Sequence, residues 1–240
     1  MCATCGCDTH THSHSHSHSH THDHGEKHIA VEKDVLYENN LLAARNRGFF
    51  DAKNILAINL VSSPGSGKTT LLERTLTDLK DTVNFSVIEG DQQTTRDADR
   101  IHATGTKVVQ INTGKGCHLD AHMVMHALQG MHPHENGIVF IENVGNLVCP
   151  AMFDLGEKER VVVMSVTEGD DKPLKYPDMF HTSHLCIINK IDLLPYVPFS
   201  LDKAIANAKR INPKLEVITL SCTSGEGLDK WYQWLESKKS

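Results

Sequence analysis

A glycine-rich segment between an apolar run and a helix-like run carries the first clear chemistry of the sequence. Residues 62–70 read Ser-Ser-Pro-Gly-Ser-Gly-Lys-Thr-Thr, between the apolar residues 55–61 and the helix-like residues 71–76. A strand, a glycine-rich turn and a helix, ending in Gly-Lys-Thr, predict a phosphate-binding loop, in which backbone N–H groups and the helix dipole face an anion. The residues expected to hold a nucleoside triphosphate are Pro64, Gly65, Ser66, Gly67, Lys68, Thr69 and Thr70, with the Thr69 hydroxyl on Mg²⁺.

Acidic residues end two of the apolar runs that follow this loop. Asp91 comes after residues 83–88, and Glu142 ends residues 137–142. Because the carboxyl ends of parallel strands meet at one edge of a sheet, we expect both carboxylates beside the phosphates, as ligands of Mg²⁺ or neighbours of the attacking water. A helix N-cap is the alternative role for Asp91. Gly145 can add a backbone N–H near the γ-phosphate, so the predicted catalytic residues are Lys68, Asp91, Glu142 and Gly145.

The tetrad Asn-Lys-Ile-Asp at residues 189–192 predicts which base is bound. Its aspartate can accept from both the ring N–H and the exocyclic amine of guanine, a pair that adenine does not offer. The string alone is weak, but here it follows the strand-like residues 184–188 and stands about 120 residues after the phosphate-binding loop. We therefore predict GTP and GDP as ligands. The residues expected at the base are Asn189, Lys190 and Asp192, with the backbone of Ser221 and Cys222 in a later turn.

Metal-ligating side chains are concentrated first in the N-terminal tail. Cys2, Cys5 and Cys7 precede histidines that alternate with Thr, Ser and Asp, namely His10, His12, His14, His16, His18, His20, His22 and His24. Thiolate and imidazole are ligands of borderline and soft divalent metals such as Zn²⁺ and Ni²⁺, and three close thiolates can wrap one ion. We interpret the histidine run as a low-affinity metal buffer, with a purification tag as the alternative. The segment has no apolar residues for a core, so we expect it to be disordered without a ligand.

A second group of candidate ligands lies inside the predicted domain. Cys117 and His118 are adjacent in a glycine-rich turn, and Cys149 stands near the end of another strand. A Cys-His pair alone is more often coincidental than metal-binding, but the third thiol and the metal-rich tail favour a shared site. His122 and His126 continue the helical face from His118, and we interpret them as surface histidines.

The elements that must position these groups alternate between strand and helix. Further strand-like runs occupy residues 107–111, 160–166 and 216–220, and further helix-like runs occupy residues 31–45, 202–208 and 228–238. This alternation predicts an α/β fold, a mostly parallel sheet flanked by helices, of the phosphate-loop NTPase type. We expect residues 176–180 to cover the site. The predicted divisions are a metal-binding tail at 1–28, an N-terminal helix and linker at 29–54, and a GTPase domain at 55–240.

The length, charge and composition of the chain limit the partners and the location that can be expected for it. A chain of 240 residues is long enough for one sizeable domain plus a tail. The net charge of −6, without a basic stripe, predicts no nucleic-acid partner. No long apolar segment or signal-like N-terminus is present in the sequence, so we expect no membrane insertion and a cytoplasmic protein. Seven cysteines in that compartment predict metal or redox thiols rather than disulfides.

Taken together, these motifs resemble the hydrogenase nickel-incorporation GTPases of the HypB family. The matching motifs span essentially the whole chain: the three-thiol N-terminus, the histidine tract, Ser-Ser-Pro-Gly-Ser-Gly-Lys-Thr with Ser62 in place of the usual first glycine, Gly-Lys-Gly-Cys117-His118, residues 142–150 and the tetrad. The resemblance implies a dimerising, SIMIBI-class phosphate-loop GTPase that hydrolyses GTP slowly and delivers nickel to [NiFe] hydrogenase. Its implied partners are a second copy of the chain, a nickel-binding accessory protein of hydrogenase maturation, and the hydrogenase large subunit.

The resemblance also implies two metal sites and a mechanism. One site, for Ni²⁺ or Zn²⁺, lies at the dimer interface and uses Cys117, His118 and Cys149; the other is a tight nickel site at Cys2, Cys5 and Cys7, with the N-terminal amine if Met1 is removed. The γ-phosphate is expected to order residues 91–97 and 142–150, and so to move Cys149. No arginine finger can be picked out, so we expect slow hydrolysis. The alternatives are a urease-type nickel GTPase and a nickel or zinc storage protein with a regulatory GTPase domain.

Overall fold

The computed structural model describes residues 24–91, 96–114 and 116–239, with side chains from residue 34 onward. The chain divides into two compact units, Met1–Asp34 and Val35–Ser240, and only the second is described further. The N-terminal thiols and the histidine run up to His22 lie outside the described residues. The first helix, α1 (His24–Ala52), starts earlier and ends later than the helix-like run 31–45 predicts.

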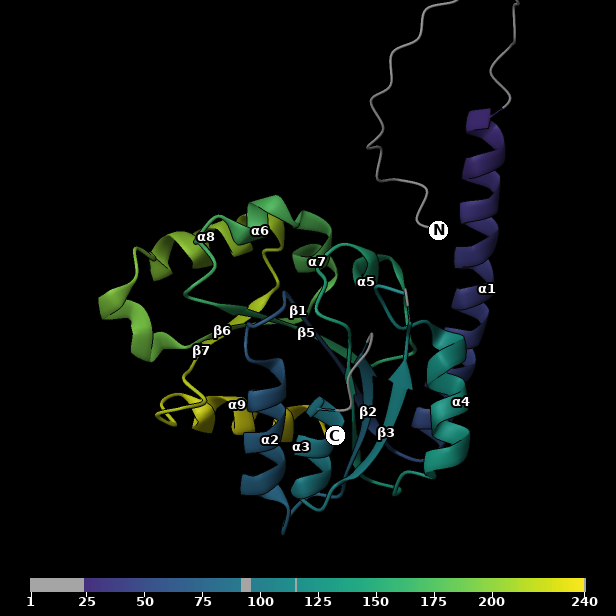
Figure 1. The fold of residues 1–240 in the computed structure, drawn as a ribbon, viewed down its shortest axis with the longest axis horizontal. Helices are drawn as coiled ribbons and strands as arrows, with labels where there is room; N and C mark the ends of the chain where they lie inside the picture. Colours follow the sequence, from purple (N-terminus) through teal and green to yellow (C-terminus); the bar gives the residue numbers. More distant parts are fainter. Residues whose placement is uncertain (1–23, 92–95, 115, 240) are drawn as a thin grey trace, which may run out of the picture. The chain divides into compact units, whose positions relative to one another are not determined.

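In the described part of the chain, seven parallel strands form one sheet in the order β3-β2-β4-β1-β5-β6-β7 (Figure 1). The chain runs outward from β1 in both directions, so the carboxyl edge beside β1 is a topological switch point, where open α/β sheets bind ligands. This confirms the predicted fold class. The strands are β1 (Leu56–Ser62), β2 (Phe85–Asp91), β3 (Lys107–Asn112), β4 (Ile138–Glu142), β5 (Glu159–Ser165), β6 (Leu185–Asn189) and β7 (Glu216–Thr219).

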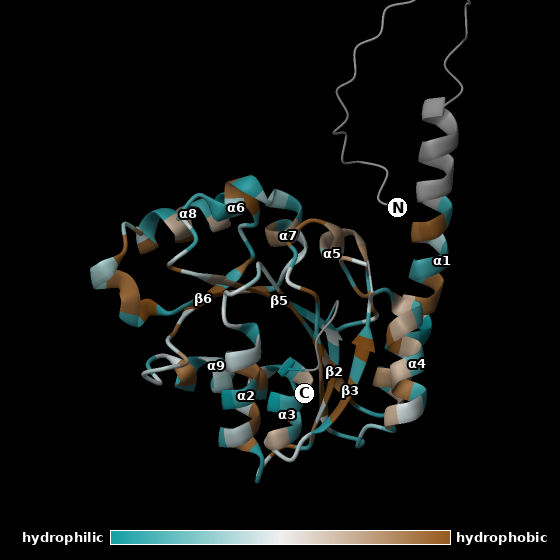
Figure 2. Cartoon of the chain, viewed as in Figure 1, coloured by the Kyte–Doolittle hydropathy of each residue, from teal (hydrophilic) through white to brown (hydrophobic). Residues whose placement is uncertain are grey.

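Helices cover both faces of the sheet because the central strands are apolar on both sides (Figure 2). One face packs on α2 (Lys68–Leu79), α3 (Arg96–Ala103) and α9 (Leu228–Lys238), with Phe140 against Trp231 in its core. The other face packs on the end of α1 and on a second set of helices. These are α4 (Ala121–Met131), α5 (Cys149–Met152), α7 (Pro177–Thr182) and α8 (Leu201–Ile211), with α6 (Lys172–Lys175) and the 3₁₀ helix η1 (Ile191–Tyr196) beside them.

The expectation that residues 176–180 cover the nucleotide site is wrong. Met179 and Phe180 lie in α7 and are fully buried against the sheet, in the same core cluster as Val61 and Cys186. Their apolar side chains remove more surface from water on the sheet than they could over a polar cleft. The lining of the nucleotide cavity therefore comes from other segments, described below.

Among the described residues, no helix is both long enough and apolar enough to cross a membrane. The longest, α1, has 29 residues but is charged along its length.

Candidate nucleotide and metal sites

The loop between β1 and α2 has the backbone that its glycines require. Gly65 and Gly67 have φ values of 75° and 95°, in the left-handed region that only glycine adopts at little cost. A Cβ atom on Gly67 would also collide with the side-chain amide of Asn189. Gly67 caps α2, whose first helical residues are Lys68 and Thr69. The loop therefore presents a helix N-terminus toward the carboxyl edge of the sheet, as an anion site demands.

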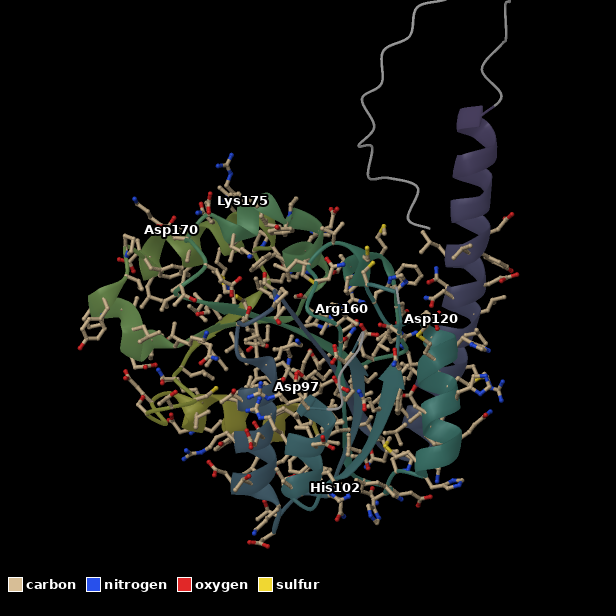
Figure 3. All side chains as sticks on the ribbon, viewed as in Figure 1. Asp97, His102, Asp120, Arg160, Asp170 and Lys175 are labelled. Atoms are coloured by element: carbon tan, nitrogen blue, oxygen red, sulfur yellow. The ribbon has the colours of Figure 1, made fainter. Side chains whose placement is uncertain are left out.

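A cavity of about 530 Å³ opens over this loop. It gathers every predicted phosphate-loop residue together with Asp91, Gly145 and Lys190 from three other segments. Asp97, labelled in Figure 3, reaches the cavity from the first turn of α3. The full lining is Ser62, Pro64, Gly65, Ser66, Gly67, Lys68, Thr69, Thr70, Asp91, Asp97, Arg100, Val144, Gly145 and Lys190. The structure thus brings the predicted phosphate-binding and catalytic residues to one place.

Glu142 is buried against the phosphate loop and is not among the residues that line the cavity. Its Oε1 atom accepts a hydrogen bond from the Thr69 hydroxyl at 2.6 Å and lies 3.7 Å from the Lys68 ammonium. Burial raises the pKa of the Glu142 carboxyl, against the opposing effects of Lys68 and Thr69. Its Oε2 atom is buried and has no hydrogen-bond partner among the described residues. Hydroxyl and carboxylate oxygens are the ligands that Mg²⁺ takes in proteins, so this unpaired oxygen beside Thr69 fits the predicted magnesium site.

Glu89 is a site residue that the sequence analysis missed. It is buried in β2 directly opposite Glu142 in the parallel register, and its own Oε2 has no hydrogen-bond partner in the described part of the chain. Burial, and then the neighbouring carboxylates of Glu142 and Asp91, raise the pKa of Glu89 to about 8. A signal was present: Glu89 interrupts an apolar strand two residues before Asp91, so both side chains share one face of the sheet.

The guanine tetrad is bonded directly to the phosphate loop. The Asn189 side chain donates to the Ser66 carbonyl at 3.0 Å, and the Lys190 ammonium donates to the Gly65 carbonyl at 2.7 Å. Asp192 Oδ1 is buried and meets no hydrogen-bond partner among residues 24–91, 96–114 and 116–239. A carboxylate oxygen with unused acceptor capacity, two residues after the Lys190 that bonds to the phosphate loop, fits recognition of guanine N–H groups.

The later turn lies against the same tetrad. The backbone N–H of Cys222 donates to Asn189 Oδ1 at 3.3 Å, while the backbone N–H of Ser221 donates to the Glu226 carbonyl. Neither residue lines the cavity over the phosphate loop. Contact of this turn with the guanine O6 therefore stays a prediction.

Glu168 is a second residue that the sequence analysis missed, and it bonds to Ser66 of the phosphate loop. Its Oε1 atom accepts from the Ser66 hydroxyl at 2.6 Å and from the Ser165 backbone N–H at 2.9 Å. Its Oε2 atom pairs with the Lys172 ammonium at 2.8 Å, and both side chains are largely buried. A charge-assisted hydrogen bond of this kind holds the Ser66 turn more firmly than a neutral one. From sequence alone, this acid was an unassigned member of a polar loop.

Arg100 is the third residue that the sequence did not single out. It lines the cavity from α3, where its guanidinium pairs with Glu73 at 2.6 Å and lies 3.4 Å from Asp97. It also donates to the Thr70 hydroxyl at 3.2 Å. Arg100 therefore adds a third cation to the cavity lining, besides Lys68 and Lys190.

The predicted metal ligands of the domain come together. The Sγ atoms of Cys117 and Cys149 are 2.9 Å apart, and Cys117 Sγ lies 3.7 Å from His118 Nδ1. The three ligand atoms lie within 4.8 Å of one another, and neither thiol forms a disulfide in the described part of the chain. Burial lowers the pKa of His118, which keeps the imidazole neutral and able to ligate. His122 and His126 are exposed on α4, as interpreted.

The other two described cysteines differ from Cys117 and Cys149 in their burial. Cys186 and Cys222 are buried, and burial raises their pKa values to about 12 and about 11. Because their pKa values lie well above 7, both side chains remain protonated thiols near neutral pH. Metal binding needs the thiolate, which a lowered pKa favours, so neither cysteine is a candidate ligand.

A parallel sheet with a phosphate loop at its switch point defines a phosphate-loop NTPase, and the cluster of two thiols and an imidazole beside it could hold a metal ion. The profile of the CobW/HypB/UreG nucleotide-binding domain matches residues 56–219. Hydrogenase maturation factor HypB of Escherichia coli K12 is 61% identical over 211 residues, covering 88% of this chain and 73% of the relative. The probable HypB of Methanocaldococcus jannaschii is 46% identical over 206 residues, covering 86% and 93%.

Two solved structures share the fold at substantial identity. HypB of Archaeoglobus fulgidus has a TM-score of 0.80 at 40% identity, covering 85% of this chain and 100% of that one. HypB of Helicobacter pylori, solved in complex with nickel, has a TM-score of 0.78 at 38% identity, covering 84% and 95%. The chain belongs to the HypB family of hydrogenase maturation factors, within the CobW/HypB/UreG group.

Proposed function

We propose that the protein is a GTP-hydrolysing nickel metallochaperone that inserts nickel during the maturation of [NiFe] hydrogenase. The names of its relatives and the nickel complex of the Helicobacter pylori structure support the cargo and the pathway. The observation that carries the proposal is local: Cys149, a member of the three-ligand cluster, lies on the segment that begins at Glu142 beside the phosphate loop. One segment therefore contacts both the nucleotide cavity and the metal ligands.

Hydrolysis of GTP follows from the residues around the cavity. Asp192 selects guanine through its unpaired carboxylate oxygen, and Lys68 leaves Glu142 to contact the outer phosphates. Thr69, Glu142 and Asp91 would hold Mg²⁺, which supplies charge neutralisation between the β- and γ-phosphates when bound. Gly145 supplies a backbone N–H at the γ-phosphate end of the cavity. Arg100 is tied to Glu73 and Asp97, so we expect slow intrinsic hydrolysis.

Nucleotide state controls the metal site in this proposal. The γ-phosphate contacts the 142–150 segment at Gly145 and thereby repositions Cys149 relative to Cys117 and His118. Ni²⁺ or Zn²⁺ is bound at this cluster, and a second nickel site uses Cys2, Cys5 and Cys7 in the tail. A local change at the γ-phosphate that biases a two-state segment is the usual physics of GTPase switching.

The proposed assembly is a homodimer that depends on GTP, on metal or on both. Val148 and Met152 flank Cys149 and are 56% and 47% exposed, so an apolar surface adjoins the metal ligands. Such a surface supports an interface that encloses the cluster. We also propose a cytoplasmic location, where thiols stay reduced, and transfer of nickel through a nickel-binding accessory protein to the hydrogenase large subunit.

Urease maturation is the second candidate. It is favoured by one relative, the hydrogenase/urease maturation factor HypB of Helicobacter hepaticus, which is 40% identical over 219 residues and covered to 90%. The storage alternative is disfavoured, because the complete nucleotide cavity described above has no role in passive storage.

A complementation experiment tests the proposed function. The chain is expressed in a bacterium whose own hydrogenase maturation factor has been deleted, at limiting nickel. We expect hydrogenase activity to return with the unsubstituted chain and not with Lys68→Ala at equal protein levels. Equal activity with both chains would contradict a GTP-dependent role, and restoration of urease alone would favour the second candidate.

A further inference from the structure

The two thiols of the metal cluster reach each other from strands that are not neighbours. Cys117 follows β3 and Cys149 follows β4, and β2 lies between these strands in the sheet. Strands two positions apart are separated by about 10 Å, whereas the two Sγ atoms are 2.9 Å apart. The loops that carry the thiols must therefore be held together above the edge of the sheet.

Asn146 makes the side-chain connection between these loops nearest to the ligands. Its Nδ2 atom donates to the Cys117 carbonyl at 3.2 Å, and its Oδ1 atom accepts from the Val148 backbone N–H at 2.9 Å. The first bond crosses to the loop of Cys117, and the second shapes the turn that leads into Cys149. An amide side chain offers a donor and an acceptor at once, which neither Asp nor Ala does.

The same turn touches the phosphate loop. Gly145 packs so closely on Pro64 that a Cβ atom there would lie 3.1 Å from the Pro64 Cα atom. A shift of Pro64 or of the γ-phosphate end of the cavity must therefore move Gly145, and Asn146 follows it directly in the chain. On the inner side, the buried Asn143 accepts from the backbone N–H of Leu119 at 3.1 Å, which anchors the base of the Cys117 loop.

We propose that Asn146 is a positioning residue for the metal site: it fixes Cys117 against Cys149 and transmits the state of the phosphate loop to both thiols. The proposal rests on the nucleotide-controlled metal binding of the proposed function. The half-buried Asn146 lies at the surface of the turn, so its loss leaves no core cavity. Asn143, which is buried, holds the fold itself.

The test uses the full-length chain with Cys2, Cys5 and Cys7 replaced by Ser. The histidine tail then gives no thiolate-to-nickel charge-transfer absorption, so this absorption reports Ni²⁺ at Cys117 and Cys149, since Cys186 and Cys222 are buried. Nickel affinity is measured against a competing chelator, with GDP and with a non-hydrolysable GTP analogue. The variants are Asn146→Ala, Asn146→Asp and the matched control Asn207→Ala, which removes a half-buried amide bonded to the Asp170 carbonyl.

We expect Asn146→Ala to lower the nickel affinity about 10- to 100-fold in the tighter nucleotide state and to bring the ratio of the two affinities close to one. Asn146→Asp keeps the acceptor for Val148 but loses the donor to Cys117, so its ratio should collapse as well. Metal-free kcat and KM for GTP should change by less than about twofold, and Asn207→Ala should match the parent chain.

Any of three results would overturn the proposal. A nucleotide-dependent affinity that survives in both Asn146 variants, or a loss of metal-free hydrolysis as large as the loss of affinity, would overturn this proposal alone. Equal affinities of the parent chain, which lacks only the three tail thiols, with the two nucleotides would overturn the proposed coupling together with it. Thermal unfolding of each variant confirms that it is folded.

Discussion

The nucleotide cavity and the candidate metal cluster share one segment, residues 142–150, which contributes Val144 and Gly145 to the cavity and Cys149 to the cluster, but they are built differently. The phosphate loop exposes Pro64 and Gly65 but buries Ser66, Lys68 and Thr69. It is bonded to three other parts of the chain, namely Glu142, Glu168 and the tetrad at Asn189 and Lys190. The metal ligands are half-buried and stand on loops joined by single amide side chains. The nucleotide site is thus pre-organised, whereas the metal site can rearrange at low cost.

This difference predicts that substitutions in the nucleotide site affect the metal site, whereas substitutions in the metal site do not affect the nucleotide site. Loss of a nucleotide-site residue should abolish hydrolysis and the control of metal binding together, because in the proposed mechanism the phosphate loop moves residues 142–150. Loss of a metal ligand should leave hydrolysis intact, because the phosphate loop does not depend on the thiols for its shape.

The largest effect is expected from Lys68→Ala. Its ammonium, now 3.7 Å from Glu142, is the only group placed by the loop itself to neutralise the outer phosphates, so we expect kcat/KM for GTP to fall about 10³-fold. Steady-state phosphate release measures this. The exposed Lys80→Ala at the end of α2 serves as control and should hydrolyse GTP normally. Nickel bound by the tail should persist in this variant. A loss of tail-bound nickel would show that the tail site depends on the nucleotide site.

A smaller and opposite pattern is expected from Cys117→Ala. Removal of one of three ligand atoms should weaken Ni²⁺ at this cluster at least about 100-fold while metal-free hydrolysis stays within about twofold. Native mass spectrometry with and without GTP measures metal content and oligomeric state together. His102→Ala, an exposed histidine on α3 labelled in Figure 3, is the matched control. A parallel drop in hydrolysis would show that the thiol loops support the phosphate loop after all.

Glu89, buried opposite Glu142, should make the stability of the fold depend on pH. The unfolded chain releases the Glu89 proton near pH 4.5, whereas burial raises the folded pKa to about 8. The folded state therefore holds the extra proton between these values, and the free energy of unfolding should fall as pH rises from about 5 to about 8. Glu89→Gln should flatten this slope by on the order of 3 kcal/mol across the range. Urea unfolding of the metal-free protein at each pH measures it, and an unchanged slope would refute the assignment.

The smallest effect is expected from Glu168→Gln. The amide keeps an acceptor for the Ser66 hydroxyl but loses the charge and the pairing with Lys172, a difference of about 1 kcal/mol. We expect KM for GTP to rise about threefold to tenfold with kcat little changed. Glu168→Ala should go further in the same direction. A variant indistinguishable from the parent would mean that the tetrad alone holds the loop.

The sequence sufficed wherever the chemistry is local. The phosphate loop, the acid ending β4 and the tetrad each lie within a few residues, and their spacing against apolar runs predicted the sheet and its edge. Cys117 and Cys149 were paired correctly because both follow strands. Glu89, Asn146 and Glu168 were not predicted, because their importance depends on strand register and on bonds to residues at least 29 positions away.

The prediction that residues 176–180 cover the nucleotide site was wrong for a related reason. A loop-like string rich in Pro and aromatic residues does not reveal whether it faces a cleft or the sheet, and burial of Met179 and Phe180 decided for the sheet. The side of a sheet that a connection covers is set by packing volume, which sequence spacing does not encode.

In the proposed mechanism, nucleotide state sets the affinity of Cys117, His118 and Cys149 for nickel. The direct measurement is the Ni²⁺ dissociation constant of this cluster, read by thiolate charge transfer in the full-length chain lacking the tail thiols, with GDP and with a non-hydrolysable GTP analogue. We predict that the two constants differ by about tenfold or more, which corresponds to about 1.4 kcal/mol of coupling. Equal constants and equal stoichiometries in the two states would show that the nucleotide does not control metal binding at this cluster.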